Sequence, residues 1–124
     1  MQKSKGLMTR TSVNLPELLA RVDNDHELLR DLISIFAKEF PRHLVALQEA
    51  VAREDANQVA SVSHTLKGML SNLAVTKAAA SAGHLEQQAR SGKQSSFKEA
   101  LAAFEQEVHG LLPEMETYMA EVEP

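Results

Sequence analysis

Cysteine and tryptophan are absent from the sequence, and aromatic residues are scarce: one tyrosine and four phenylalanines make up 4% of the 124 residues. Without cysteine, the chain can form no disulfide framework and can carry out no thiol chemistry. With so few aromatics, the 44% of hydrophobic residues is mostly leucine, valine, alanine, isoleucine and methionine. Such side chains suit the packing of helices better than a sheet, and we therefore expect an all-α protein.

Long apolar segments are also lacking. No run approaches the roughly 20 apolar residues that a membrane-spanning helix needs. The first nine residues contain lysines but no apolar stretch of signal-peptide length. The formal net charge of −4 argues against nucleic acid as a partner. We expect a cytoplasmic, monomeric protein that binds neither a membrane nor nucleic acid.

The chain is long enough for one domain with one hydrophobic core. Residues 1–11 are polar and are expected to form a flexible N-terminal segment, and the domain is expected to occupy residues 12–124. Within it, apolar residues recur every three or four positions, the spacing of an amphipathic helix. The expected helices cover residues 15–22, 25–53, 56–73, 77–91 and 96–122. Four long helices with short connections indicate an antiparallel up-down four-helix bundle, with the short first helix added at its N-terminal end.

Capping residues and breaks predict where these helices begin and end. The expected starts lie at Asn14, Asn24 (with Glu27), Asp55 (with Gln58), Thr76 and Ser96 (with Glu99). Gly92 is expected to end the fourth of the five helices. Pro41 and Pro113 lie within apolar periodicity that continues beyond them, so both are expected to kink their helices.

The helix that carries His64 organises the chain. One of its faces bears an apolar stripe of Val59, Val62, Leu66, Met69, Leu70 and Leu73. His64 lies almost opposite this stripe, close to Ser61, Gly68 and Ser71 on neighbouring turns, and Lys67 lies beside them. A nucleophilic imidazole is therefore expected to face solvent among residues with small side chains or none.

Gly68 is unusual because a glycine inside a helix costs about 1 kcal/mol relative to alanine. One reason to keep it is that a partner molecule must approach His64, one turn away. Lys67, three residues after His64, is placed to offset the charge of an anion attached to the imidazole. The constellation predicts a phosphate-carrying His64, with Lys67 stabilising the charge and Gly68, Ser61 and Ser71 leaving space. From residue type alone, an ordinary exposed histidine is the alternative.

The motif His64-Thr65-Leu66-Lys67-Gly68, followed by Ser71-Asn72-Leu73, resembles the His-x-x-Lys-Gly core of histidine-containing phosphotransfer (HPt) domains of two-component phosphorelays. The resemblance covers the segment from Asp25 to Arg90. Its other matching residues are Glu27-Leu28-Leu29, Leu32-Ile33, Phe36, Glu39 and Pro41 upstream, and Ala82, Leu85-Glu86, Ala89-Arg90 and Gly92 downstream. Departures from the family pattern at Met69, Leu70, Ala74 and Ala78 concern packing rather than the chemistry.

The resemblance implies the same four-helix bundle, and a phosphocarrier rather than a self-sufficient enzyme. It implies that His64 accepts a phosphoryl group from an aspartyl phosphate on one receiver domain and passes it to the aspartate of a second. The expected partners are therefore response regulator receiver domains and a hybrid sensor histidine kinase. In such systems the receiver supplies Mg²⁺, and no cofactor or metal is expected on this chain. The sequence contains no glycine-rich phosphate loop that would indicate an ATP site.

Antiparallel pairing across the connection at residues 74–76 brings residues 85–90 level with His64. Glu86 is then placed to accept a hydrogen bond from the imidazole nitrogen that is not the nucleophile, with Arg90 nearby. A solvated pair of Glu86 and Arg90 is the alternative.

Partner docking is expected to use the short first helix and exposed residues around His64. Leu15 and Leu18 are candidates for this surface, although packing in the core is favoured for both. A partner interface with an apolar centre and a polar rim would be typical.

Two further functions are open at this point. One is a helical interaction module that binds a receiver without carrying phosphate, which the intact His64, Lys67 and Gly68 disfavour. The other is the phosphoacceptor domain of a chemotaxis-type histidine kinase, suggested by Gly83-His84-Leu85-Glu86, whose phosphate would come from ATP on a separate catalytic domain. The remaining histidines (His26, His43, His84 and His109) lie in no comparable constellation, and no paired Glu-x-x-His motifs indicate a metal site.

Overall fold

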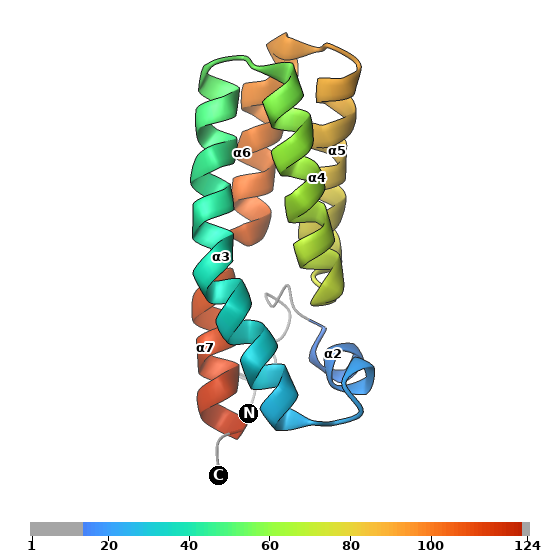
Figure 1. Cartoon of the computed structure of the whole chain (residues 1–124), viewed down its shortest axis with the longest axis vertical. Coiled ribbons are helices and arrows are strands. Elements are labelled where there is room, and N and C mark those ends of the chain that lie inside the picture. Colours follow the sequence, from blue (N-terminus) through green and yellow to red (C-terminus); the bar gives the residue numbers. More distant parts are fainter. Residues whose placement is uncertain (1–13, 123–124) are drawn as a thin grey trace, which may run out of the picture.

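Helices are the regular elements of residues 14–122, the part of the chain that the computed structural model describes (Figure 1). In chain order they are α2 (Leu15–Arg21), α3 (His26–Ala52), α4 (Ala56–Asn72), α5 (Thr76–Arg90), the 3₁₀ turn η1 (Gln94–Ser96), α6 (Phe97–Val108) and α7 (Leu111–Val122). The predicted all-α fold is confirmed. The predicted flexible segment, residues 1–11, lies outside the described residues.

The four-helix bundle consists of α3, α4, α5 and α6, each antiparallel to the next (Figure 1). α4 packs against α3 and α5, and α6 closes the bundle against α5 and α3. α7 continues beyond α6 along the first half of α3. α3 bends near its middle (Figure 1). Pro41 lies inside this helix, and it is the predicted cause of a kink because proline has no N–H for the helical ladder and its ring crowds the preceding turn.

Aliphatic and phenylalanine side chains form the core, as the composition predicts. The rings of Phe36 and Phe40 stack with their centroids 4.8 Å apart. Other large, almost fully buried side chains are Leu29, Leu47, Leu66, Leu70, Leu85, Phe97 and Phe104. Burial of each contributes about 1.5–3 kcal/mol. From α5 the core receives mainly small side chains (Ala78, Ala79, Ala82 and Ala89), and these let α5 approach α4 closely.

Two of the predicted helix starts have the expected capping bonds. The side chain of Asn14 accepts a hydrogen bond from the backbone N–H of Glu17 (3.2 Å), and that of Asp55 accepts one from the N–H of Gln58 (3.2 Å). Such bonds satisfy backbone donors that have no partner within the helix.

The predicted cap at Asn24 is wrong. Asp23 and Asn24 both adopt left-handed conformations (φ 53° and 61°), so the helix begins one residue later than predicted. Asp25 is the N-cap instead, and its carboxylate accepts a hydrogen bond from the N–H of Leu28 at 3.0 Å.

Two other predicted caps also differ. Thr76 is the first residue of α5 rather than its cap, because Ala74 turns the chain with φ 59° and buries Val75 at the cap position. Ser96 does stand at the N-cap of α6, but its hydroxyl lies 2.6 Å from Oε1 of Gln88 and 2.7 Å from the carbonyl oxygen of Lys93. The Ser96 side chain therefore ties η1 to α5 and leaves the first turn of α6 uncapped.

The helix predicted over residues 96–122 is divided into α6 and α7. The break lies at Gly110, which adopts φ 79°, a conformation that glycine takes without strain. Pro113 lies in the first turn of α7, where a missing N–H breaks no helical hydrogen bond. The predicted kink at Pro113 is therefore wrong, and Gly110 turns the chain instead.

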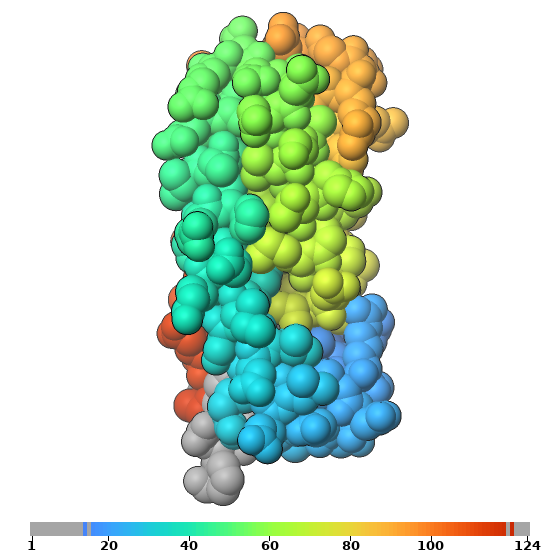
Figure 2. Space-filling view, in the orientation of Figure 1, coloured from blue at the N-terminus to red at the C-terminus, as the bar shows by residue number. Residues whose placement is uncertain are grey.

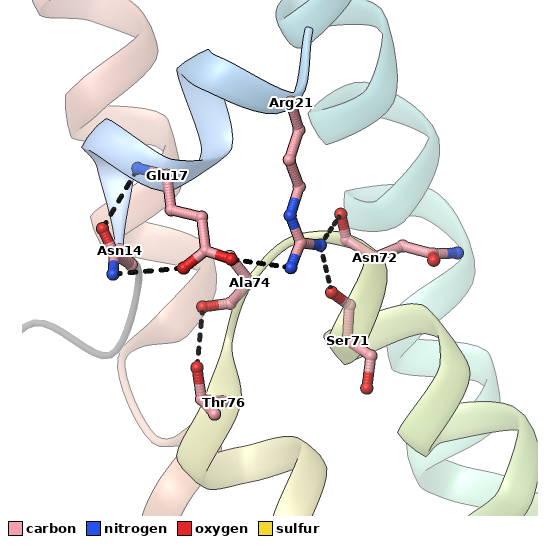
Figure 3. Close-up of polar contacts among 7 residues, drawn as sticks. All are labelled: Asn14, Glu17, Arg21, Ser71, Asn72, Ala74 and Thr76. Atoms are coloured by element: carbon pink, nitrogen blue, oxygen red, sulfur yellow. Dashed lines mark hydrogen bonds and ion pairs between the residues drawn. The ribbon is translucent and has the colours of Figure 1, made fainter.

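Arg21 anchors α2 to the end of α4 (Figure 3). Its guanidinium donates to the backbone carbonyl oxygens of Ser71 (2.6 Å) and Asn72 (3.3 Å), and it pairs with Glu17 at 2.8 Å. A cation is favourable at this position because the last carbonyls of a helix carry partial negative charge.

α2 and the first part of α3 cover the end of the bundle below α4 (Figure 2). Leu18 of α2 is 1% exposed, so the preference for core packing at this residue is confirmed. The side chain of Leu15 lies outside what the structure describes.

Candidate functional site

His64 projects from the middle of α4, away from the core. Ser63 and Leu66 on the same helix are fully buried, whereas the side chain of His64 is 63% exposed. The apolar stripe of α4 fixes this orientation, since the residues on the opposite face must then point to solvent. α4 therefore presents an accessible imidazole where the helical wheel predicts one.

Glu86 of α5 is the acidic partner of His64. Its Oε2 lies 3.1 Å from Nδ1 of the imidazole, and its side chain is only 10% exposed because α5 packs closely on α4. Arg90 donates to the same oxygen from Nη2 (2.6 Å) and Nε (3.0 Å). Nζ of Lys67 lies 3.2 Å from the other oxygen, Oε1. Three nitrogen-bearing side chains thus converge on one nearly buried carboxylate.

The surroundings of Glu86 lower its pKa below the ordinary value of 4.5. Burial alone raises the pKa, because it disfavours the charged form, but hydrogen bonds from Arg90 and Lys67 and the charges of Lys67 and His64 outweigh it. An ionised carboxylate can only accept hydrogen bonds, so the Nδ1 that faces Glu86 carries the proton in the neutral imidazole. Nε2 then holds the lone pair and is the ring nitrogen that is available to act as a nucleophile.

Gly68 leaves open space beside His64. Apart from the adjoining part of α4 itself, a Cβ placed on Gly68 would meet no atom of the described residues within 4 Å. Its role in catalysis stays a prediction.

Gly83 of α5 belongs to the same cluster, although the sequence pattern does not assign it there. A Cβ at this position would lie 3.2 Å from Cδ of Lys67, closer than ordinary van der Waals contact. A glycine in the middle of a helix, at the register that faces Lys67, is the signal that identifies it.

The structure brings Glu86 and Arg90 together with His64 and Lys67, but the two predicted serines lie at the edges of this cluster. Both are exposed on α4. The carbonyl oxygen of Ser61 accepts a bond from the hydroxyl of Thr65 (3.3 Å), and that of Ser71 accepts one from Arg21. Ser71 therefore lies at the junction with α2, and the part of both serines in leaving space stays a prediction.

Neither a metal site nor a membrane-spanning helix is found among the residues that the structure describes. Between residues 14 and 122, no group of three or more histidine, aspartate or glutamate side chains is arranged to hold a metal ion. Among the described helices, none combines the length and the apolar character that crossing a membrane requires.

The comparison with known families matches residues 31–122 to the model of the Hpt domain. The chain therefore belongs to the Hpt domain family. Its fold is similar to that in the crystal structure of histidine-containing phosphotransfer protein B (HptB) from Pseudomonas aeruginosa PAO1. The TM-score is 0.81, with 19% sequence identity over 90% of this chain and 96% of that chain, and at this identity the likeness concerns the fold. No curated protein sequence matches the chain.

Proposed function

We propose that this Hpt domain relays phosphoryl groups between aspartates of receiver domains through phospho-His64, as a cytoplasmic phosphocarrier in a two-component phosphorelay. The observation that carries the proposal is the 3.1 Å contact between Nδ1 of His64 and the nearly buried carboxylate of Glu86. This contact orients an exposed imidazole and leaves Nε2 as its free nucleophile.

The proposed step forms one bond and breaks one. The lone pair of Nε2 attacks the phosphorus of an aspartyl phosphate on the receiver, the P–O bond to the aspartate breaks, and the aspartate leaves as a carboxylate. Nδ1 keeps its proton, so the phosphorylated ring is cationic, and the negative charge of Glu86 stabilises it. Transfer to a second receiver reverses the step, and His64 leaves as the neutral imidazole.

Lys67 is the proposed source of charge stabilisation for the phosphoryl oxygens. In the transition state of phosphoryl transfer, negative charge is spread over these oxygens, and catalysis is mostly positioning and electrostatics. At about 4 Å, opposite charges near a protein surface attract by a few kcal/mol. The receiver is expected to supply Mg²⁺ and its own lysine.

The receiver is proposed to dock over His64 and toward the end of the bundle formed by α2 and α3. Leu28, Leu32 and Ile35 of α3 are exposed (42%, 36% and 59%) and lie three to four residues apart, so they form one line along this helix. Exposed apolar side chains that share a line on one helix are typical of a protein interface. A hybrid sensor histidine kinase carrying such a receiver is the proposed donor.

Transfer from purified receiver domains tests the proposal. Receivers of the source organism, labelled on their aspartates, are mixed with wild type, with His64→Gln, and with His84→Gln as a control for loss of an exposed histidine elsewhere in the bundle. We expect acid-labile, base-stable label on wild type and on His84→Gln, and none on His64→Gln.

The other outcomes separate the alternative functions. Receivers that bind the protein without labelling it would favour the interaction module. Label that arrives only from an ATP-bound kinase domain would favour the chemotaxis-type phosphoacceptor.

A further inference from the structure

A second glycine lies inside a helix of the site. Gly83 is in the middle of α5, where glycine is unfavourable because it gains no side-chain contacts and loses more backbone freedom than alanine. Unlike Gly92 and Gly110, Gly83 has no positive φ that would require a glycine. Its presence calls for a reason in the neighbouring structure.

The antiparallel register of α4 and α5 supplies that neighbour. Glu86 lies beside His64. Gly83 lies three residues before Glu86 on α5, and Lys67 lies three residues after His64 on α4. The same register therefore brings Gly83 opposite Lys67. The geometry agrees, since a Cβ on Gly83 would lie 3.2 Å from Cδ of Lys67.

Cδ of Lys67 thus lies against position 83, so that even a Cβ there requires the lysine stem to shift, and a longer side chain requires a larger shift. From there its Nζ reaches Oε1 of Glu86 at 3.2 Å, one helical turn further along α5. Because Glu86 also contacts His64, this path holds the ammonium of Lys67 beside the imidazole, even though the Lys67 side chain is 41% exposed.

We propose that Gly83 is a positioning residue that seats the stem of Lys67 against α5 and thereby directs its ammonium to the Glu86–His64 pair. The expected effect on phosphotransfer rests on the proposed function, but the contact between Gly83 and the stem of Lys67 is a property of the unphosphorylated protein. A side chain at position 83 displaces Lys67 outward, and the displacement grows with the size of the side chain.

The test compares Gly83→Ala and Gly83→Leu with Lys67→Ala and with the double variant Gly83→Leu/Lys67→Ala. His84→Leu is the matched control, because His84 is the exposed neighbour of Gly83 and points about 100° away around α5. The first readout needs no receiver: the Glu86 carboxyl is titrated by carbon NMR in the full chain. The second readout is the rate of phosphoryl transfer from the receiver that labels wild type fastest.

We expect the titration of Glu86 to move to higher pH in Gly83→Leu and Lys67→Ala by similar amounts, and to stay unchanged in His84→Leu. We expect Gly83→Leu to slow transfer about tenfold, as Lys67→Ala does, and the double variant to be no slower than Lys67→Ala alone. Gly83→Ala should raise the melting temperature by a few degrees, because alanine favours the helix. It should nevertheless slow transfer by an intermediate factor, so lower stability cannot account for the loss.

Additive losses in the double variant would overturn the proposal, because Gly83→Leu would then act on something other than Lys67. An unchanged Glu86 titration in Gly83→Leu would overturn it as well. If no receiver labels wild type, the proposed function fails, and the titration alone decides whether Gly83 seats Lys67.

Discussion

Glu86 and His64 are 22 positions apart in the sequence, yet one carboxylate oxygen of Glu86 lies 3.1 Å from Nδ1 of His64. The short connection between α4 and α5 fixes this contact, since two antiparallel helices joined by a tight turn keep one register along their length. An acid and an imidazole on facing helices thus form a unit, and the charge of the acid should control both stability and chemistry.

Glu86→Gln should destabilise the protein by about 1–2 kcal/mol near neutral pH, because it weakens the hydrogen bonds to a charged, nearly buried carboxylate. The loss is no larger because the three partner side chains are partly exposed to solvent, which screens their charges. The pKa of Glu86 is lowered in the folded state, so its stabilising contribution is complete above pH 4.5 and is lost as the pH falls through the lower folded-state pKa. The gap in unfolding free energy between wild type and Glu86→Gln should therefore narrow below about pH 4.5. Urea denaturation between pH 3 and pH 8 measures this gap.

An exposed acid on α6 is the control for that comparison. Glu99→Gln should remain within about 0.5 kcal/mol of wild type at pH 7. A gap between wild type and Glu86→Gln that widens toward low pH would contradict the charged, hydrogen-bonded state of Glu86.

The sequence predicted the helices and the positions of His64 and Glu86 well, because both depend on periodicity. The stripe from Val59 to Leu73 determined which way His64 points, and the register across residues 74–76 placed Glu86 beside it. Prediction failed where competing local interactions decide the outcome. Left-handed residues moved the cap from Asn24 to Asp25, and Gly110 rather than Pro113 broke the last helix.

The contact of Lys67 with Gly83 was not predicted from the sequence, although a glycine in the middle of the helix marked the position. Periodicity gives the face on which a residue lies, but it does not give the path of a long side chain across a neighbouring helix. The route of Lys67 over Gly83 is determined by the distance between α4 and α5, which the buried alanines of α5 set.

Arg21→Ala should loosen α2 from the bundle. The change removes hydrogen bonds to the carbonyls of Ser71 and Asn72 and the pair with Glu17, and should cost about 1 kcal/mol because the side chain is partly exposed. Amide hydrogen exchange should become faster in α2 before it does so in α4. The matched control is Arg42→Ala, which removes an exposed pair with Glu39 within α3 and should cost less than about 0.5 kcal/mol. Equal losses in the two variants would show that the contact between α2 and α4 is not held by Arg21.

Leu32→Ser/Ile35→Ser should weaken binding to the receiver without unfolding the bundle. Both side chains are exposed on α3, so their removal costs little folding energy but takes apolar area from the proposed docking line. We expect affinity to fall about tenfold or more in calorimetric titration with a receiver domain. Val45→Ser is the control, because Val45 is 51% exposed on the same helix but lies off this line. If Val45→Ser weakens binding as much as the double variant does, the docking surface lies elsewhere on α3.

Ser63→Ala should stabilise the protein, although Ser63 is adjacent to His64, the proposed phosphoacceptor. Its side chain is fully buried, and its hydroxyl has no hydrogen-bond partner among the residues that the structure describes. Burying an unpaired hydroxyl costs about 1–3 kcal/mol, so its removal should raise the unfolding free energy by about 1 kcal/mol beyond the gain in helix propensity. Ser61→Ala, at an exposed position of the same helix, reports the propensity gain alone. Phosphotransfer should stay at the wild-type rate in Ser63→Ala, because the hydroxyl points to the core and the imidazole of His64 points away from it. A loss of stability in Ser63→Ala would instead mean that the hydroxyl is paired in solution and contributes to the packing of α4.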